Sequence, residues 1–325
     1  MTEDYQGSLI KRTFIPGSKW LFYKFYSGHI TGGLILRGLI KPLTNKLLKD
    51  QLIDQWFFVR YADPEPHLRV RLHLTASEYL QGVLSYFKDS IQKYFYPGQI
   101  YKIQIDTYHR EIERYGSFTI EQSEKLFSND SQMVIKLLDI INGDEGESIR
   151  WLFSMRSIDS LLNDFKYNMN QKLELLRRLN QNFSKEFNKD TILAKQLSKK
   201  YRDNLKEIHV FLNADNNTKH NFPDKIFQIT RERSKLNTTI VEEIRALQEK
   251  DKLTVPVDIL LESYIHMIMN RIFRSRQRLH EMVIYDFLFR HYKSQVAKLK
   301  YQNIICNLHD NEIHSLDKIE KKKIE

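Results

Sequence analysis

The sequence predicts an α+β fold, with a mainly antiparallel sheet in the N-terminal third packed with a helix-rich C-terminal two thirds. Four alternating or strongly aromatic runs, which favour strands, occur before residue 110. Beyond Thr119 the apolar residues recur almost entirely at helical spacing. Strands followed by a block of helices are typical of α+β folds and not of parallel βαβ units.

The N-terminal elements alternate between strands and helices. Trp20 to Tyr26 is mostly aromatic and predicts a strand that ends at Ser27-Gly28, and Ser77 is a good N-cap for a helix. Glycines weaken the first predicted helix. In chain order we expect a strand at 20–26, helices at 31–40 and 43–52, a hairpin at 56–74, a helix at 77–92 and a strand at 101–108.

The C-terminal elements are helices separated by polar breaks. We expect helices at 120–127, 131–141 and 147–164, a Lys- and Asn-rich helical region at 172–212, a polar loop at 213–223, and helices at 225–250, 257–273 and 277–296. We interpret residues 1–325 as a single domain. Its Lys-rich segment at about 172–250 is interpreted as an insertion or a partner-facing arm, and residues 317–325 as a charged, frayed tail.

The hairpin at 56–74 carries an unusual row of basic residues. After the Asp63-Pro64-Glu65-Pro66 turn, three leucines and one valine alternate with His67, Arg69, Arg71 and His73. Four cation-capable side chains on one face repel each other unless an anion lies near them. Because arginine grips oxyanions bidentately, this face is a candidate carboxylate- or phosphate-binding platform; a solvated basic strand face is the alternative.

Two further clusters are candidates for chemistry. Tyr108 to Gly116 lies at a strand end and contains Arg114, although a self-neutralised surface turn explains its mixed charges equally well. In the predicted helix at 257–273, Glu262, His266 and Asn270 share one face. Glu262 could orient the imidazole and Asn270 could hold the ring or a substrate carbonyl, while an ordinary interhelical histidine is the alternative.

Composition narrows the class of protein. The chain has 325 residues and a net charge of +10, which favours an acidic partner such as nucleic acid, a membrane surface or an acidic peptide. A single cysteine, Cys306, excludes an internal disulfide and a cysteine metal cluster. No signal peptide, membrane-length apolar run, nucleotide-binding loop or zincin motif occurs. We therefore expect a cytoplasmic protein with no metal, no cofactor and no transmembrane segment.

The three clusters together resemble the C-terminal elimination domain of lantibiotic dehydratases, also known alone as the thiopeptide-type bacteriocin biosynthesis domain. The resemblance runs from about Trp20 to Tyr292. Its motifs stand here as Trp20-Leu-Phe-Tyr-Lys-Phe-Tyr26, the segment from Trp56 to Arg71, Glu111-Ile-Glu-Arg-Tyr-Gly116 and His266-Met-Ile-Met-Asn-Arg271. The residues at about 172–250 match no motif of the family.

The resemblance implies a lyase that eliminates glutamate from glutamylated Ser or Thr of a precursor peptide. It implies catalytic roles for Arg69, Arg71, Arg114 and His266, and we add as substrate-binding candidates Arg60, His67, Tyr108, Glu262 and Asn270. The expected partners are a precursor peptide and a separate glutamylating subunit, without nucleic acid; a homodimer is left open. The alternatives are a pyridine-forming [4+2] cyclase of thiopeptide biosynthesis and a non-catalytic peptide-binding subunit.

Overall fold

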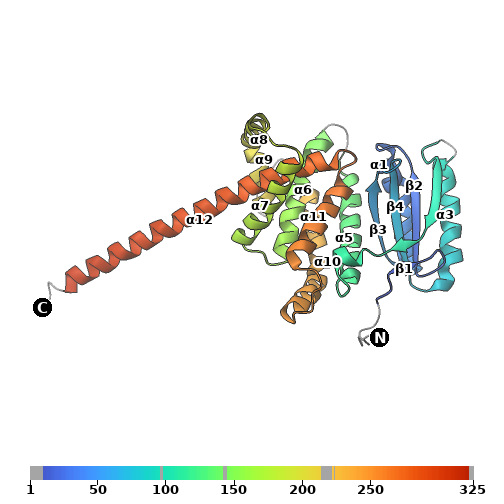
Figure 1. Cartoon of the computed structure of the whole chain (residues 1–325), viewed down its shortest axis with the longest axis horizontal. Coiled ribbons are helices and arrows are strands. Elements are labelled where there is room, and N and C mark those ends of the chain that lie inside the picture. The colour runs from blue at the N-terminus through green and yellow to red at the C-terminus, as the bar shows by residue number, and fades with distance from the viewer. Residues whose placement is uncertain (1–9, 96–97, 142–144, 214–221, 223, 322–325) are drawn as a thin grey trace. The chain divides into compact units, whose positions relative to one another are not determined.

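A four-stranded antiparallel sheet in the N-terminal part of the chain confirms the predicted fold class (Figure 1). The computed structural model describes residues 10–95, 98–141, 145–213, 222 and 224–321. Its strand order is β3-β4-β2-β5, and β1 and β6 form a separate two-stranded sheet. The strands are β1 (Thr13–Phe14), β2 (Trp20–Tyr26), β3 (Ile53–Tyr61), β4 (His67–Leu74), β5 (Lys102–Asp106) and β6 (Tyr108–His109).

Helices form most of the remaining described chain. They are α1 (Thr31–Ile35), the π-helical turn η1 (Leu36–Ile40), α2 (Lys41–Lys49), the 3-10 turn η2 (Ser77–Tyr79), α3 (Leu80–Phe95), α4 (Ile112–Tyr115), α5 (Ile120–Leu138), α6 (Glu145–Asp164), α7 (Met169–Glu186), α8 (Thr191–Asp203), α9 (Leu205–Asn213), α10 (Asp224–Glu249), α11 (Val257–Ile272) and α12 (Gln277–Lys321). Within these ranges every helix is too short or too polar to cross a lipid bilayer.

The chain divides into two compact units. The first comprises Met1–Phe165 and Asn204–Glu281, and the second comprises Lys166–Asp203 and Met282–Glu325. The strands and all nine predicted site residues belong to the first unit. The Lys-rich segment at about 172–250 divides between the two units, because α7 and α8 belong to the second and α9 and α10 to the first.

Several predicted boundaries differ from the structure. The helices expected at 120–127 and 131–141 are one helix, α5, and the Lys- and Asn-rich region forms three helices. The helix expected at 277–296 extends to Lys321, so the first residues of the expected frayed tail are helical. Most of the polar loop expected at 213–223 and the last residues of the tail, 322–325, lie outside the described residues.

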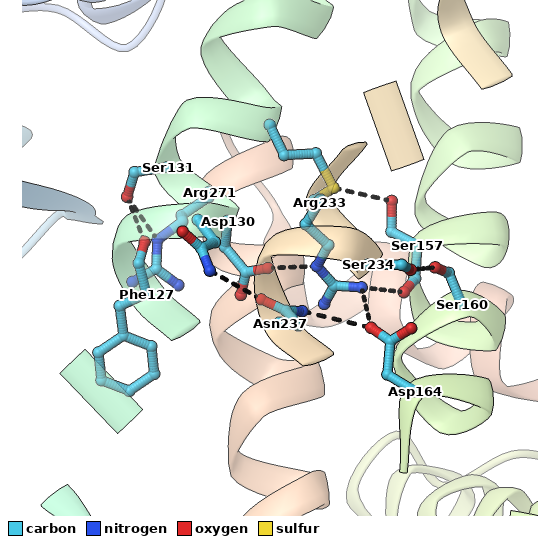
Figure 2. A network of polar contacts seen from close by, with 12 residues as sticks. Phe127, Asp130, Ser131, Ser157, Ser160, Asp164, Arg233, Ser234, Asn237 and Arg271 are labelled. Carbon is cyan, nitrogen blue, oxygen red and sulfur yellow. Dashed lines mark hydrogen bonds and ion pairs between the residues drawn. The ribbon is translucent and has the colours of Figure 1, made fainter. Parts of the chain in front are cut away.

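The helix α5 continues through the polar residues 128–131 because their side chains find buried partners. The Nε of Arg233, on α10, donates to Asp130 Oδ1 at 2.9 Å, and the Nε of Arg271, on α11, donates to Ser131 Oγ at 3.2 Å (Figure 2). Arg233 and Asp130 are both almost fully buried. The polar stretch therefore fixes α5 against two other helices, although in isolation it resembles a helix break.

The edge strand β3 is covered by side chains from helices. The backbone N–H of Phe58 donates to Ser131 Oγ at 3.1 Å. The amide of Asn270 accepts from Arg60 N and donates to Arg60 O, each at 2.9 Å. Asn270 thus makes the two hydrogen bonds that a neighbouring strand would make, and α5 lies beside β3 while α3 lies on the other side of the sheet (Figure 1). This packing fixes α11, with His266, relative to the sheet.

Candidate active site

A cavity of about 430 Å³ lies against the basic face of the sheet. Its wall combines side chains from β3, β4, the 108–116 segment, α5 and α11. Six of the nine predicted site residues line it: Arg69, Arg71, Tyr108, Arg114, His266 and Asn270. The other three, Arg60, His67 and Glu262, are not among its described lining residues. The structure therefore brings together the four predicted catalytic residues but only two of the five predicted substrate-binding residues.

Arg71 is held in the wall by aromatic rings. Its guanidinium carbon lies 4.4 Å from the ring centroid of Phe22, 5.2 Å from that of Phe57 and 4.7 Å from that of Tyr108. Its Nε has no hydrogen-bond partner within the described part of the chain. Burial lowers the pKa of Arg71 from its ordinary value, but a guanidinium remains protonated near neutral pH. The rings fix the side chain without neutralising its charge.

Arg69 is held by a tyrosine and a histidine. Its guanidinium stacks on Tyr61, 3.4 Å from the ring centroid, and its Nε donates to His67 Nε2 at 3.0 Å. Because arginine only donates, Nε2 of His67 must be the acceptor, and Nδ1–H then donates to the carbonyl of Glu65 at 2.7 Å. Burial lowers the pKa of His67, which agrees with this neutral form. His67 therefore positions Arg69 from outside the cavity wall.

Arg114 enters the cavity from the short helix α4. Its Nε donates to Ser263 Oγ on α11 at 3.2 Å, and Nη1 lies 3.5 Å from Glu111 Oε2. Gly116 ends α4 with φ of +79°, and a Cβ there would lie 2.6 Å from Thr119 Oγ1. The turn therefore requires glycine, and this requirement fixes where Arg114 leaves the helix.

Arg110 and Tyr108, in the same segment, share a buried carboxylate. Arg110 makes a bidentate pair with Glu124 on α5, through Nε at 2.8 Å and Nη2 at 2.7 Å. The hydroxyl of Tyr108 donates to Glu124 Oε1 at 2.7 Å. The segment is thus anchored by this buried pair, while its exposed part also contains the ion pair between Arg114 and Glu111. Arg71 contacts the ring of Tyr108, while the hydroxyl of Tyr108 bonds to Glu124.

His266 is oriented by a glutamate that the sequence analysis did not single out. Its Nδ1 lies 2.7 Å from Oε1 of Glu281, whose side chain is fully buried at the start of α12. Glu281 also accepts from Arg278 Nη1 at 2.9 Å. With Nδ1 engaged, Nε2 is the ring nitrogen left for a substrate. The expected partners differ: Asn270 bonds the backbone of Arg60 and the amide of Gln277 instead.

Glu281 had no signal in the sequence. It lies fifteen residues beyond His266, across the turn between α11 and α12, so no helical spacing connects the two residues. A glutamate in the first turns of a charged helix is ordinary in itself. Only the tertiary packing of the two helices shows that this carboxylate is buried against an imidazole.

The cavity is electropositive. Three arginines line it, and Glu111 is the one carboxylate among its described lining residues. Within the described chain no group of three His, Cys, Asp or Glu side chains is arranged to hold a metal ion. The arrangement suits an anionic substrate group held by guanidinium ions, with an oriented imidazole available for proton transfer.

Comparison with sequences identifies relatives of this chain. A family model described as lantibiotic biosynthesis dehydratase C-term matches residues 20–292. The subtilin biosynthesis protein SpaB of Bacillus subtilis is 29% identical over 207 residues, which are 62% of this chain and 20% of that protein. The nisin biosynthesis protein NisB of Lactococcus lactis subsp. lactis is 32% identical over 140 residues, 41% of this chain and 13% of that protein. The chain thus spans only a minor part of these relatives.

Two solved structures share the fold. The tRNA-dependent lantibiotic dehydratase MibB from Microbispora sp. 107891 superposes with a TM-score of 0.66 at 18% identity, over 91% of this chain and 29% of that chain. The pyridine synthase TbtD from thiomuracin biosynthesis superposes with a TM-score of 0.62 at 15% identity, over 85% of this chain and 99% of that chain. At these identities the likeness shows a common fold.

Proposed function

Because the chain belongs to the lantibiotic biosynthesis dehydratase C-terminal family, we propose that it eliminates glutamate from glutamylated serine or threonine residues of a precursor peptide, leaving dehydroamino acids. The proposal is supported by one observation above all. Arg69, Arg71, Arg114 and His266 line a single cavity that is large enough for a side chain and its neighbours.

The elimination makes two electrostatic demands. A base removes the α proton, that electron pair forms the Cα–Cβ double bond, and the Cβ–O bond breaks as glutamate leaves with its carboxylate. Negative charge develops first toward the adjacent amide carbonyl and then on the leaving group. Guanidinium groups already fixed in place stabilise such charge without reorganising. Arg69, Arg71 and Arg114 are the candidates for this work.

His266 is the candidate for proton transfer. Its contact with Glu281 fixes the ring, so that Nε2 can take up or return a proton at a constant place. Within this proposal Tyr108 supports Arg71 and Asn270 supports the wall, while Arg60, His67 and Glu262 act from outside the cavity. The substrate is a precursor peptide that a separate glutamylating protein has modified, and the one free carboxylate that each glutamyl ester carries complements the basic cavity.

The direct test uses a synthetic peptide carrying a glutamyl ester on serine, followed by mass spectrometry. We expect loss of glutamate and formation of dehydroalanine with the wild type, and at least about 100-fold slower loss with His266→Ala. Formation of a pyridine from a bis-dehydroalanine peptide, without glutamate release from the ester, would instead identify a cyclase. Binding of either peptide without any reaction would identify a non-catalytic subunit.

A further inference from the structure

A second cavity, of about 400 Å³, shares Tyr61 and Asn270 with the first but is otherwise lined by different residues. Three arginines line it, namely Arg60 from β3 and Arg274 and Arg276 from the turn before α12. Asp63 is the one carboxylate among its described lining residues. Like the first cavity, it therefore combines several guanidinium groups with a single acidic side chain.

Arg60 is the most constrained of these arginines. Only 9% of the residue is exposed, and its Nε donates to the carbonyl of Arg271 at 3.1 Å. Its Nη2, in contrast, is buried and has no hydrogen-bond partner within the described part of the chain. Buried polar groups normally have partners, and a buried guanidinium without a carboxylate is costly. Because Arg60 lines this cavity, an oxyanion bound there would lie next to a guanidinium that has no carboxylate partner in the described part of the chain.

The neighbouring charges leave the positive excess of this cavity unchanged. Glu147 pairs with Arg274 and lies 3.5 Å from Nε of Arg150, so one carboxylate is shared by two arginines. Burial, together with repulsion from Arg150 and Arg274, lowers the pKa of Arg60 to about 9. None of the contacts of Arg60 described above neutralises its charge. The positive charge in this cavity therefore exceeds what the described side chains balance.

We propose that this second cavity binds an aspartate or glutamate side chain of the peptide substrate, close to the residue that enters the first cavity. This inference rests on the proposed function for the identity of the substrate. The shared wall formed by Tyr61 and Asn270 allows one peptide to reach both cavities. A free anion has the same chemistry at its carboxylate, but it lacks the attachment to a chain already held in the first cavity.

A binding titration tests the inference without any elimination step. The probe is a fluorescent peptide with one glutamate, otherwise neutral residues and no ester, titrated at low ionic strength. We expect about 10-fold weaker binding to Arg276→Gln than to the wild type, and a similar loss when the peptide glutamate is replaced by glutamine. Folded Arg60→Gln protein should also bind the probe about 10-fold more weakly than the wild type. Asp63→Asn should bind more tightly, because it removes the one opposing carboxylate.

Matched controls locate the binding site. Arg177→Gln, whose side chain is exposed on α7, should bind like the wild type. Free glutamate at the peptide's concentration should not displace the probe. Equal binding of the glutamate and glutamine peptides, an equal loss in Arg276→Gln and Arg177→Gln, or displacement by free glutamate would each overturn the inference.

A kinetic arm separates this inference from the proposed function. With a glutamylated peptide that carries a neighbouring glutamate, Arg276→Gln should raise KM about 10-fold and leave kcat nearly unchanged. If the wild type released no glutamate, the proposed function would fail while the binding result still stood. If glutamate were released with the same KM by both proteins, the second cavity would have no part in binding this substrate.

Discussion

Arg71 combines a fixed position with a charge that no described carboxylate pairs with. Three aromatic rings surround its guanidinium, and its Nε has no partner in the described chain. Arginine anchored by rings keeps its donors available for a ligand, whereas arginine anchored by a carboxylate does not. Arg110, which is paired with Glu124 in the same region, shows the second case. The difference separates a candidate ligand-binding arginine from a structural one.

Replacing Arg71 should therefore affect turnover more than stability. We expect both Arg71→Ala and Arg71→Lys to lower kcat/KM for glutamate release by about 100-fold or more, because an ammonium ion reproduces neither the planar stacking nor the bidentate grip. Mass spectrometry of the released product measures turnover, and thermal unfolding measures stability. A parallel loss of melting temperature and activity would mark Arg71 as structural.

Glu281 should act by positioning His266. We expect Glu281→Gln to lower kcat about 10- to 100-fold with little change in KM, since the amide orients the ring less firmly than the carboxylate does. Steady-state kinetics on the glutamylated peptide checks this, with Glu262→Gln as the comparison. A kcat that falls with Glu262→Gln and not with Glu281→Gln would reverse the assignment made from the geometry.

His67 should make stability depend on pH. Its pKa is lowered in the folded protein, so below the ordinary histidine pKa of about 6.5 the unfolded chain binds more protons than the folded one. The free energy of unfolding should thus decrease as pH falls from 7.5 to 5.5, and decrease less in His67→Gln. Urea unfolding of both proteins at the two pH values measures the difference. Equal losses of unfolding free energy in the two proteins would contradict the neutral form of His67 inferred from its contact with Arg69.

At the scale of elements, two helical side chains replace a missing strand next to β3. Asn270 bonds both backbone groups of Arg60, and Ser131 accepts from the N–H of Phe58. These contacts tie the edge of the sheet to α11 and α5, and thereby set the distance between the basic strand face and His266. The geometry of the first cavity depends on this clamp as much as on the residues that line it.

Removing the clamp should cost stability. We expect Asn270→Ala to lower the free energy of unfolding by about 2 kcal/mol, and Ser131→Ala by about 1–2 kcal/mol, because each leaves backbone groups of β3 without a partner. The exposed Asn170→Ala in α7 should change it by less than about 0.5 kcal/mol. Urea unfolding measures all three. An Asn270→Ala protein as stable as the Asn170→Ala control would show that water replaces the clamp.

The elements that the sequence predicted best have local signals. The aromatic run predicted β2 with the bounds that the structure has, and the alternation after Pro66 predicted the basic face of β4. The break predicted within α5 was wrong, because Asp130 and Ser131 bond to Arg233 and Arg271, more than one hundred residues away. In the candidate site, too, the residues with local sequence signals were the ones predicted. Arg69, Arg71, Arg114 and His266 stood in recognisable motifs, whereas Glu281 and the clamp by Asn270 depend on how helices pack.

For the whole molecule, charge and chemistry together favour the proposed substrate. The chain carries a net charge of +10, and arginines line the two cavities described above. Both cavities suit carboxylates attached to a peptide. A peptide that has not been glutamylated offers hydroxide as the leaving group, which guanidinium ions and an imidazole do not activate sufficiently at neutral pH. In the proposed function, glutamylation changes the leaving group into a carboxylate and adds one free carboxylate per modified residue, which the first cavity is suited to bind.

We therefore expect these 325 residues to leave an unmodified precursor peptide unchanged. The measurement is mass spectrometry of a serine- or threonine-containing peptide after long incubation with the purified protein, with and without prior glutamylation by a separate enzyme. Glutamylation should be the condition that allows dehydration. In the proposed function this chain binds the anion and transfers the proton, and the better leaving group comes with the substrate. A loss of water from the unmodified peptide with this protein alone would show that the leaving group needs no prior activation, and it would remove the reason for assigning glutamylated peptides as its substrates.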